Sequence, residues 1–321
     1  MTKGVLINDI ELGYAPISAY HFGLLIRDKA FYNNVTDSHL YLITQRKEIT
    51  FNNFYFSDSL ILSFSIQQEG NPNVIYCSLP VVQKKLNPNL KNRIELRLHN
   101  RKNTTKKKIS PPFNGTQAFS IQETEVKSGK SKIIAWFSAD KLFQKHWKGE
   151  IIVDFSRSYH EMLEFTVHYV GKSTEQNICE RLSSHSTFQE ILMKESPLIY
   201  SNIPSNEIMI MLMRIEDNNT IVKWGDESSG EDISKYIQEY TLPSHKAVSS
   251  DAEKALIRHL QPQYNKILYN SYPRKNDLIN TDFHSVILYA FSDPIKLIYD
   301  SGSITGGQYL DERDYISVER K

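Results

Sequence analysis

The sequence predicts an α+β protein built from a β-rich N-terminal domain and a smaller α/β domain. Its 321 residues exceed the length of one ordinary domain. Up to about residue 145, short apolar and β-branched runs alternate with Asn, Asp, Gly and Pro. Helical periodicity then begins between the strand-like runs. We expect a β-rich domain of unknown family over residues 1–148, a second domain over 149–277, and an extension over 278–321 that packs on the core.

Strands in the first domain are expected at 38–44 (SHLYLIT), 59–66 (SLILSFSI), 73–78 (NVIYCS) and 94–98 (IELRL). They are rich in Ile, Leu, Val, Tyr and Phe, which favour a pleated and half-buried surface. Residues 101–108 then carry five Lys and Arg side chains. This loop is either a solvated linker or a phosphate contact. The domain contains no motif that identifies a family, but it could recognise a target.

The second domain should contain a small sheet of three strands flanked by helices. Strands are expected at 151–155 and 163–170, and helices at 176–182 and 187–194. Residues 207–214 (EIMIMLMR) are almost wholly apolar, as in a central strand that is buried on both faces. A helix is expected at 249–260, capped by Ser249 or Ser250, with Glu253 in its first turn and Pro262 at its end. In the extension, 285–291 is expected to be a strand.

Composition narrows the possible environments and partners. The net charge of +1 means that any surface for nucleic acid must be a local patch. Cys77 and Cys179 are too few and too far apart for a zinc site or a disulfide framework. The longest apolar run, 208–213, is far too short to span a bilayer, and the N-terminal residues lack the apolar region of a signal peptide. We therefore expect a cytoplasmic protein without membrane contact.

Several residue types suited to phosphate chemistry recur around one predicted strand and two helices. Tyr169 comes at a strand end, and Gly171 allows a sharp exit from the sheet. Arg181 and His185 stand four residues apart, which places them on one helical face. Glu253 adds a carboxylate. A phenol, a guanidinium, an imidazole and a carboxylate together could neutralise phosphate, bind a hard cation and move a proton.

These residues also form a pattern that resembles the GIY-YIG nuclease superfamily. Tyr169-Val170-Gly171-Lys172, Arg181-Leu182 and His185 resemble the second half of its signature. The stretches 252–257 (AEKALI), 261–265 (QPQYN) and 272–273 (YP) resemble its downstream block. The likeness covers about residues 150–275. It implies a metal-dependent endonuclease that hydrolyses phosphodiester bonds, with Mg²⁺ or Mn²⁺ as cofactor.

The resemblance also implies roles for single residues. Tyr169 would contact the attacking water or the phosphate, and Arg181 would stabilise the pentacovalent phosphate. Glu253 would be the only protein ligand of the metal. His185 and Lys172 would be further catalytic or phosphate-contacting residues. The remaining residues would contact the substrate or the phosphate, or, for Asn265, tie the helix of Glu253 to the first strands: Ser173, Asn265 and His168.

The sequence departs from the family pattern in one respect. Neither Gly-Ile-Tyr nor Gly-Val-Tyr precedes Tyr169 nearby, and the first motif tyrosine is the proposed general base or its helper. Tyr159 is the nearest stand-in, with His160 and His168 as rival bases. Without a base, the domain would bind nucleic acid and not cut it.

Three functions remain open. The first is a restriction-like or phage-defence endonuclease that acts on double-stranded DNA and finds its target through the N-terminal domain. The second is a repair nuclease that recognises DNA structure. The third is an inert module that binds nucleic acid or another protein. Taken singly, each motif residue has an ordinary structural explanation, such as a sheet tyrosine or a solvated helix face. A homodimer or a complex with a partner protein is compatible with each function.

Overall fold

The computed structural model describes residues 4–100, 113–195, 206–222, 229–241, 243–274, 277, 284–308 and 314–319. The chain is 25% helix and 41% strand, which confirms a mixed α and β protein. No helix in these ranges is long and apolar enough to cross a membrane. The basic loop 101–108 lies outside the described residues.

The chain folds into two compact units, and the first of them is discontinuous in sequence. Unit 1 comprises residues 1–46, 164–197 and 207–321, and unit 2 comprises residues 47–163 and 198–206. This division differs from the boundary that we expected at 148/149. The first strands of the chain pair with strands from its C-terminal half, and local composition carries no signal of such distant pairing. Unit 2 is an insertion between two paired strands of unit 1.

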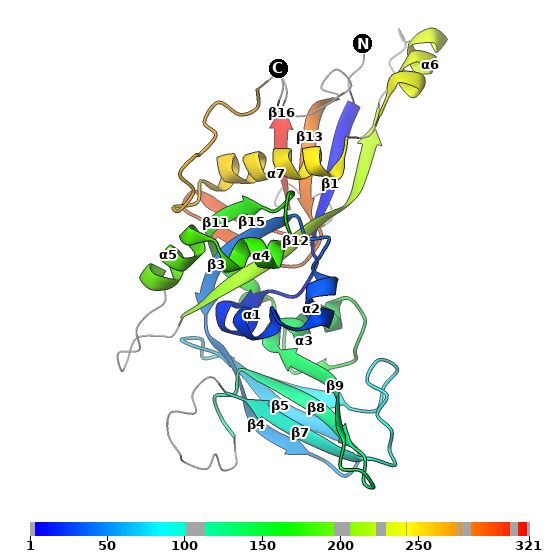
Figure 1. Ribbon diagram of the computed structural model, residues 1–321, viewed down its shortest axis with the longest axis vertical. Helices are drawn as coiled ribbons and strands as arrows, with labels where there is room; N and C mark the ends of the chain where they lie inside the picture. The colour runs from blue at the N-terminus through cyan, green and yellow to red at the C-terminus, as the bar shows by residue number, and fades with distance from the viewer. Residues whose placement is uncertain are drawn as a thin grey trace. The chain divides into compact units, whose positions relative to one another are not determined.

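One mixed sheet forms the centre of unit 1 (Figure 1). Its strand order is β15-β14-β11-β3-β12-β1-β13-β16, with β2 paired to β12. The sheet therefore has nine strands and not three, because strands from the start and from the end of the chain pair with those of its middle. The residues beyond 278 supply four of these strands. The bounds are β1 (Gly4–Leu12), β2 (Ile17–Ser18), β3 (Leu40–Lys47), β11 (Glu164–Lys172), β12 (Asn206–Ile221), β13 (His284–Phe291), β14 (Lys296–Tyr299), β15 (Gly302–Thr305) and β16 (Tyr315–Glu319).

Four helices of unit 1 share one apolar core with strands β3 and β12. The helices of this unit are α1 (Ala19–Leu25), α2 (Lys29–Asn34), α4 (Ile178–Ser183), α5 (Ser186–Glu195), α6 (Gly230–Glu239) and α7 (His245–Leu260). The core joins side chains of α1, α2, α4 and α5 to Tyr41, Ile43 and the inward side chains of β12. Residues 207–213 are all buried, which confirms the prediction of a central strand. Helix α7 packs on β11 and β16.

Helix α7 begins earlier than the sequence analysis predicted. Ser244 is its cap, and its hydroxyl accepts a hydrogen bond from the Ala247 amide at 3.3 Å. Glu253 therefore lies in the middle of the helix, and the prediction of a first-turn position was wrong. The predicted end was correct, because the helix stops at Leu260, before the left-handed Gln261 and then Pro262.

Unit 2 contains two antiparallel sheets with the strand orders β10-β6-β5-β4 and β7-β8-β9. Phe51, Phe64 and Phe119 pack against one another in its core. Strands β5, β6 and β7 confirm three of the predicted strands of the N-terminal half, and β3 of unit 1 confirms the fourth. The bounds are β4 (Ile49–Phe56), β5 (Ile61–Gln68), β6 (Ile75–Pro80), β7 (Arg93–His99), β8 (Ala118–Thr124), β9 (Ser131–Ser138), α3 (Ala139–Trp147), β10 (Asp154–Phe155) and the short 3₁₀ helix η1 (His160–Leu163).

Candidate functional site

A pocket of about 310 Å³ in unit 1 brings together five of the residues that the sequence analysis selected. Three separate segments line it: β11, the corner between α4 and α5, and α7 with the loop that follows. Tyr169 and Gly171 lie inside β11 and pair with β3, so the predicted strand end at Tyr169 and sharp exit at Gly171 were wrong. Its lining residues are Tyr169, Arg181, Ser184, His185, Ser186, Thr187, Glu253, Ile257, Tyr264, Asn265, Lys266, Ile267 and Tyr269. Most of them can form hydrogen bonds or carry charge.

A second tyrosine, which the sequence analysis did not select, stacks on Tyr169. The Tyr41 ring on β3 lies 6.0 Å from the Tyr169 ring, with an angle of 28° between their planes. Strands β3 and β11 are antiparallel neighbours, with Tyr41 opposite Gly171. A Cβ atom on Gly171 would lie only 2.5 Å from the Tyr41 ring, so the glycine makes room for this stack. The sequence did place Tyr41 in the predicted strand 38–44. Nothing in the neighbouring residues indicated that this strand would pair with the strand of Tyr169.

The two phenols differ in exposure, since Tyr41 is buried and Tyr169 is half-buried. Burial raises the pKa of Tyr41, and the nearby Tyr169 raises it further, whereas the Arg181 guanidinium opposes the shift. The Tyr41 hydroxyl is buried and forms no hydrogen bond of good geometry with any described residue. Burial also raises the pKa of Tyr169, with the Glu253 carboxylate as the next cause. Both phenols are therefore protonated at neutral pH.

Arg181 supplies positive charge to the same region. Asn177 caps helix α4, because its side chain accepts a hydrogen bond from the Cys179 amide, and Arg181 follows in the last turn. Its guanidinium favours the ionised forms of both tyrosines and disfavours protonation of His185. Such a donor suits the charge that develops on a phosphoryl group during hydrolysis.

His185 caps helix α5, and this contact assigns its tautomer. Its Nδ1 accepts a hydrogen bond from the Phe188 amide at 3.1 Å. An accepting Nδ1 carries no proton, so the neutral ring carries its proton on Nε2. Burial and the Arg181 charge lower the pKa of His185 to about 4. The imidazole is therefore neutral at neutral pH and acts as a donor through Nε2, so it is not available there as a base.

Glu253 is the carboxylate of this pocket, and Lys172 pairs with it. The Lys172 Nζ atom lies 3.2 Å from Glu253 Oε2, and the glutamate side chain is largely buried. No cluster of three or more His, Cys, Asp or Glu side chains suited to a metal occurs among the described residues. The donor set fits one hard cation that takes its other oxygen ligands from phosphate and water. Lys172 would have to move from the carboxylate for such an ion to bind.

Asn265 ties the loop after α7 to strand β11. Its Oδ1 accepts from the Val170 amide at 2.9 Å, and its Nδ2 donates to the Val170 carbonyl at 2.8 Å. The Tyr264 amide adds a third bond to the His168 carbonyl at 3.1 Å. Strand β14 pairs with β11 only at residues 164–166, so Asn265 continues this edge where the neighbouring strand is missing. Two of the three hydrogen bonds that hold this pocket wall to β11 come from the Asn265 amide.

We expect Asn265→Ala to lower the free energy of unfolding by about 2–4 kcal/mol, because it leaves two polar groups of the buried Val170 unpaired. Urea denaturation with linear extrapolation measures the change. Asn270→Ala is the matched control, since Asn270 lies in the same loop and is exposed. Equal stability of the two variants would contradict the importance of the double hydrogen bond.

The remaining selected residues do not line this pocket. Ser173 closes a turn, where its hydroxyl donates to the Gln176 carbonyl at 2.6 Å. His168 is buried on β11, and its Nε2 lies 3.2 Å from Gln45 Oε1. Tyr159 and His160 belong to unit 2. The Tyr159 hydroxyl lies 2.9 Å from His146 Nδ1, and its ring stacks on Phe143 in the core of that unit.

Comparison with known proteins does not assign a function to this site. No family model, no curated protein and no solved structure matches the chain. The functional argument therefore depends on the residues themselves and on the geometry of the pocket.

Proposed function

We propose that the protein is a metal-dependent endonuclease that hydrolyses phosphodiester bonds in DNA. One observation supports this proposal above the others. Tyr169, Arg181 and Glu253 come from three separate segments of the chain and line a single pocket, together with His185. The pocket combines the groups that phosphodiester hydrolysis needs: positive charge, a carboxylate for a cation, and hydroxyl groups to bind water.

Glu253 is the residue that would hold Mg²⁺ or Mn²⁺. When bound, such an ion polarises a phosphoryl oxygen and lowers the pKa of a coordinated water. Lys172, released from the carboxylate, and Lys266 at the pocket rim can bind phosphate oxygens. Arg181 can donate two parallel hydrogen bonds to the reacting phosphate, and His185 can donate one more from Nε2.

We further propose that Tyr41, and not Tyr159, is the counterpart of the first motif tyrosine. Tyr41 stacks on Tyr169 in the sheet, whereas Tyr159 contributes to the core of unit 2. Of the two phenols, Tyr169 lines the pocket and can orient the attacking water and accept its hydrogen bond, whereas the buried Tyr41 hydroxyl can act only through Tyr169. Removing a proton from them is costly, because burial raises the pKa of each. The Arg181 charge reduces this cost.

A restriction-like or phage-defence role fits this proposal, with unit 2 as the part that recognises the target. One observation favours an inert binding module as the second candidate. Lys172 occupies the carboxylate oxygen of Glu253 that a cation would need. In an inert protein this ion pair would persist, and the pocket would hold phosphate without cutting.

The test is a cleavage assay on plasmid and phage DNA with Mg²⁺, with Mn²⁺, and with EDTA. The proposal expects nicked or linear products that depend on the metal. Substrates with a junction or a lesion distinguish a repair nuclease, which would cut these and spare intact duplex. Binding without cleavage of any substrate, in either metal, would favour the inert module.

The buried His185 should make stability depend on pH. The folded-state pKa is about 4, below the ordinary value of about 6.5. Between these values the unfolded chain binds a proton that the folded protein excludes. The free energy of unfolding should therefore fall as the pH drops from about 6.5 to 4, by up to about 3 kcal/mol from this residue.

His185→Asn provides the comparison, because Asn also caps helices and does not titrate. Urea denaturation at several pH values should show a smaller fall for this variant than for the wild type. The same pH dependence in both proteins would show that His185 is not held in the neutral form.

A further inference from the structure

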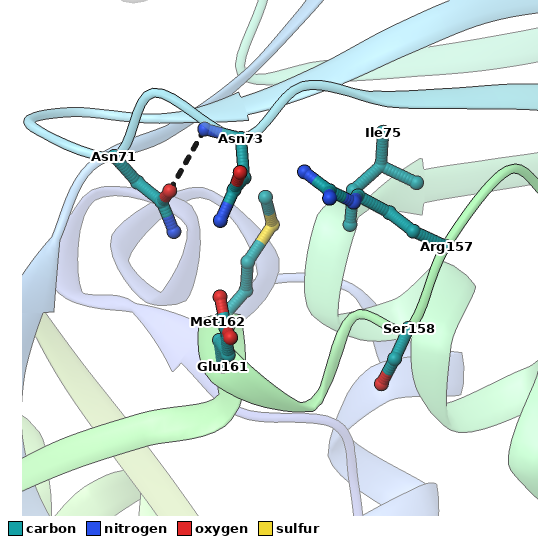
Figure 2. A pocket seen from close by; sticks show the side chains of 7 residues that line it. All are labelled: Asn71, Asn73, Ile75, Arg157, Ser158, Glu161 and Met162. Atoms are coloured by element: carbon teal, nitrogen blue, oxygen red, sulfur yellow. Dashed lines mark hydrogen bonds between the residues drawn. The ribbon is translucent and has the colours of Figure 1, made fainter.

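Unit 2 contains a pocket of its own, separate from the candidate active site. It lies between the loop that joins β5 to β6 and the segment that joins β10 to η1, and its volume is about 260 Å³ (Figure 2). Its lining residues are Asn71, Asn73, Ile75, Arg157, Ser158, Glu161 and Met162. All of them belong to unit 2.

The polar groups of this pocket are available to a ligand. The side chains of Arg157 and Glu161 are exposed, and neither forms a hydrogen bond or an ion pair with any other residue that the structure describes. Asn71 Oδ1 accepts from the Asn73 amide at 2.9 Å, which leaves the Asn71 Nδ2 group and the Asn73 side chain for other partners. Figure 2 shows the side chains of Asn71, Asn73, Arg157 and Glu161 around Met162.

The base of the pocket is apolar and its walls are held in place. Ile75 and Met162 are each only 1% exposed. Ser156 fixes one wall to β6, because its hydroxyl accepts from the Tyr76 amide and its own amide donates to the Tyr76 carbonyl, both at 2.9 Å. The Ser158 hydroxyl points away from the pocket and lies 2.7 Å from His160 Nδ1. The pocket thus combines an ordered apolar floor with unpaired groups of both charges.

We propose that this pocket binds an unpaired guanine base of a nucleic acid. The unpaired groups of both charges suit a ligand that offers both acceptors and donors, and the Glu161 carboxylate disfavours a free phosphate. Guanine offers two acceptors, O6 and N7, which an arginine binds with two hydrogen bonds. On its other side it offers N–H donors at N1 and N2, which a carboxylate accepts. Among the common bases, guanine alone combines this acceptor pair with donors on the opposite edge.

The base must be unpaired, because Glu161 would use the edge that guanine turns to cytosine in a duplex. Recognition of this kind acts on single strands, loops or extruded nucleotides. Arg157 and Glu161 would then choose guanine together, since each alone would accept another base.

The test uses the full chain in EDTA, with GMP as the probe and AMP, CMP and UMP for comparison. Titration by ligand-observed NMR should show GMP binding at least about fivefold tighter than the other three, on the scale of one two-bonded contact to a base. Arg157→Ala and Glu161→Gln should each weaken GMP binding by at least about fivefold. Equal binding of all four nucleotides, or no binding of GMP, would overturn the proposal.

Two controls separate recognition from charge and from folding. Arg93→Ala removes an exposed arginine of the same unit that pairs with Glu95 outside the pocket, and it should leave GMP binding unchanged. Loss of GMP binding in this control as well would assign the effect to net charge and overturn the proposal. Circular dichroism and thermal unfolding establish that each variant is folded before its binding is compared.

GMP binding does not depend on the proposed cleavage, so the two proposals can fail separately. Glu253→Gln should bind GMP like the wild type, because Glu253 belongs to the other unit. If the protein binds GMP but cuts no DNA, only the endonuclease proposal is refuted. Protein that cuts DNA and shows no preference for GMP would remove only the guanine pocket.

Discussion

Glu253→Gln should lower the rate of DNA cleavage by at least about 10²-fold, the scale of losing one electrostatic catalytic group. Glutamine keeps the shape of the side chain and removes the charge that anchors a hard cation. It also leaves Lys172 without its carboxylate partner, which favours contact of this lysine with phosphate. DNA binding in EDTA should therefore stay the same or become slightly tighter. Cleavage rates at saturating Mg²⁺ and binding curves in EDTA measure the two effects.

Glu190→Gln is the matched control for this experiment. Glu190 also belongs to unit 1 and also pairs with a lysine, Lys194, at 2.7 Å, but on the exposed surface of α5. Its replacement removes the same charge and should leave cleavage within about twofold, since surface pairs contribute little. Mn²⁺ titration followed by electron paramagnetic resonance, in the presence of uncleaved DNA, adds a readout that does not need activity. Full cleavage by Glu253→Gln would refute the role of this residue as the metal ligand.

The local signals in the sequence located five of the residues that line this pocket. Tyr169, Arg181 and Glu253 were selected from spacing and residue type, and the fold places them in one pocket. The buried strand through residues 207–213 and the helix end before Pro262 were also predicted correctly. Each of these features depends on side-chain pattern or backbone chemistry within a few residues, which a single sequence displays.

What the sequence could not reveal was pairing between distant strands. Tyr41 lies in a strand that was predicted, but its neighbour β11 follows only after the whole of unit 2. By position in the chain alone, Tyr159 was therefore the nearest stand-in for a first motif tyrosine. The parallel pairing of β13 with β1, which adds a strand to the sheet, was also not visible in the sequence, because the two strands lie at opposite ends of the chain. The start of helix α7 was predicted too late because Ser249 and Ser250 can also cap a helix. Local sequence does not distinguish them from Ser244, the cap in the structure.

Arg181→Ala should also lower the cleavage rate by at least about 10²-fold, because it removes the donor best suited to charge on the reacting phosphate. Arg181→Lys keeps the charge and loses the two parallel hydrogen bonds, so its rate should fall between those of the wild type and the alanine variant. Arg258→Ala, an exposed arginine on α7, is the control and should keep the wild-type rate.

The double variant Arg181→Ala, Glu253→Gln tests whether both residues act on the same phosphate. If they do, the loss in the double variant should be clearly smaller than the product of the two single losses, because groups that act as a unit are not additive. Independent action would give the full product. Single-turnover cleavage of plasmid DNA resolves the two cases, since it measures the chemical step without product release. Multiplicative losses would show that Arg181 and Glu253 serve different steps, and would contradict the shared site that their common pocket predicts.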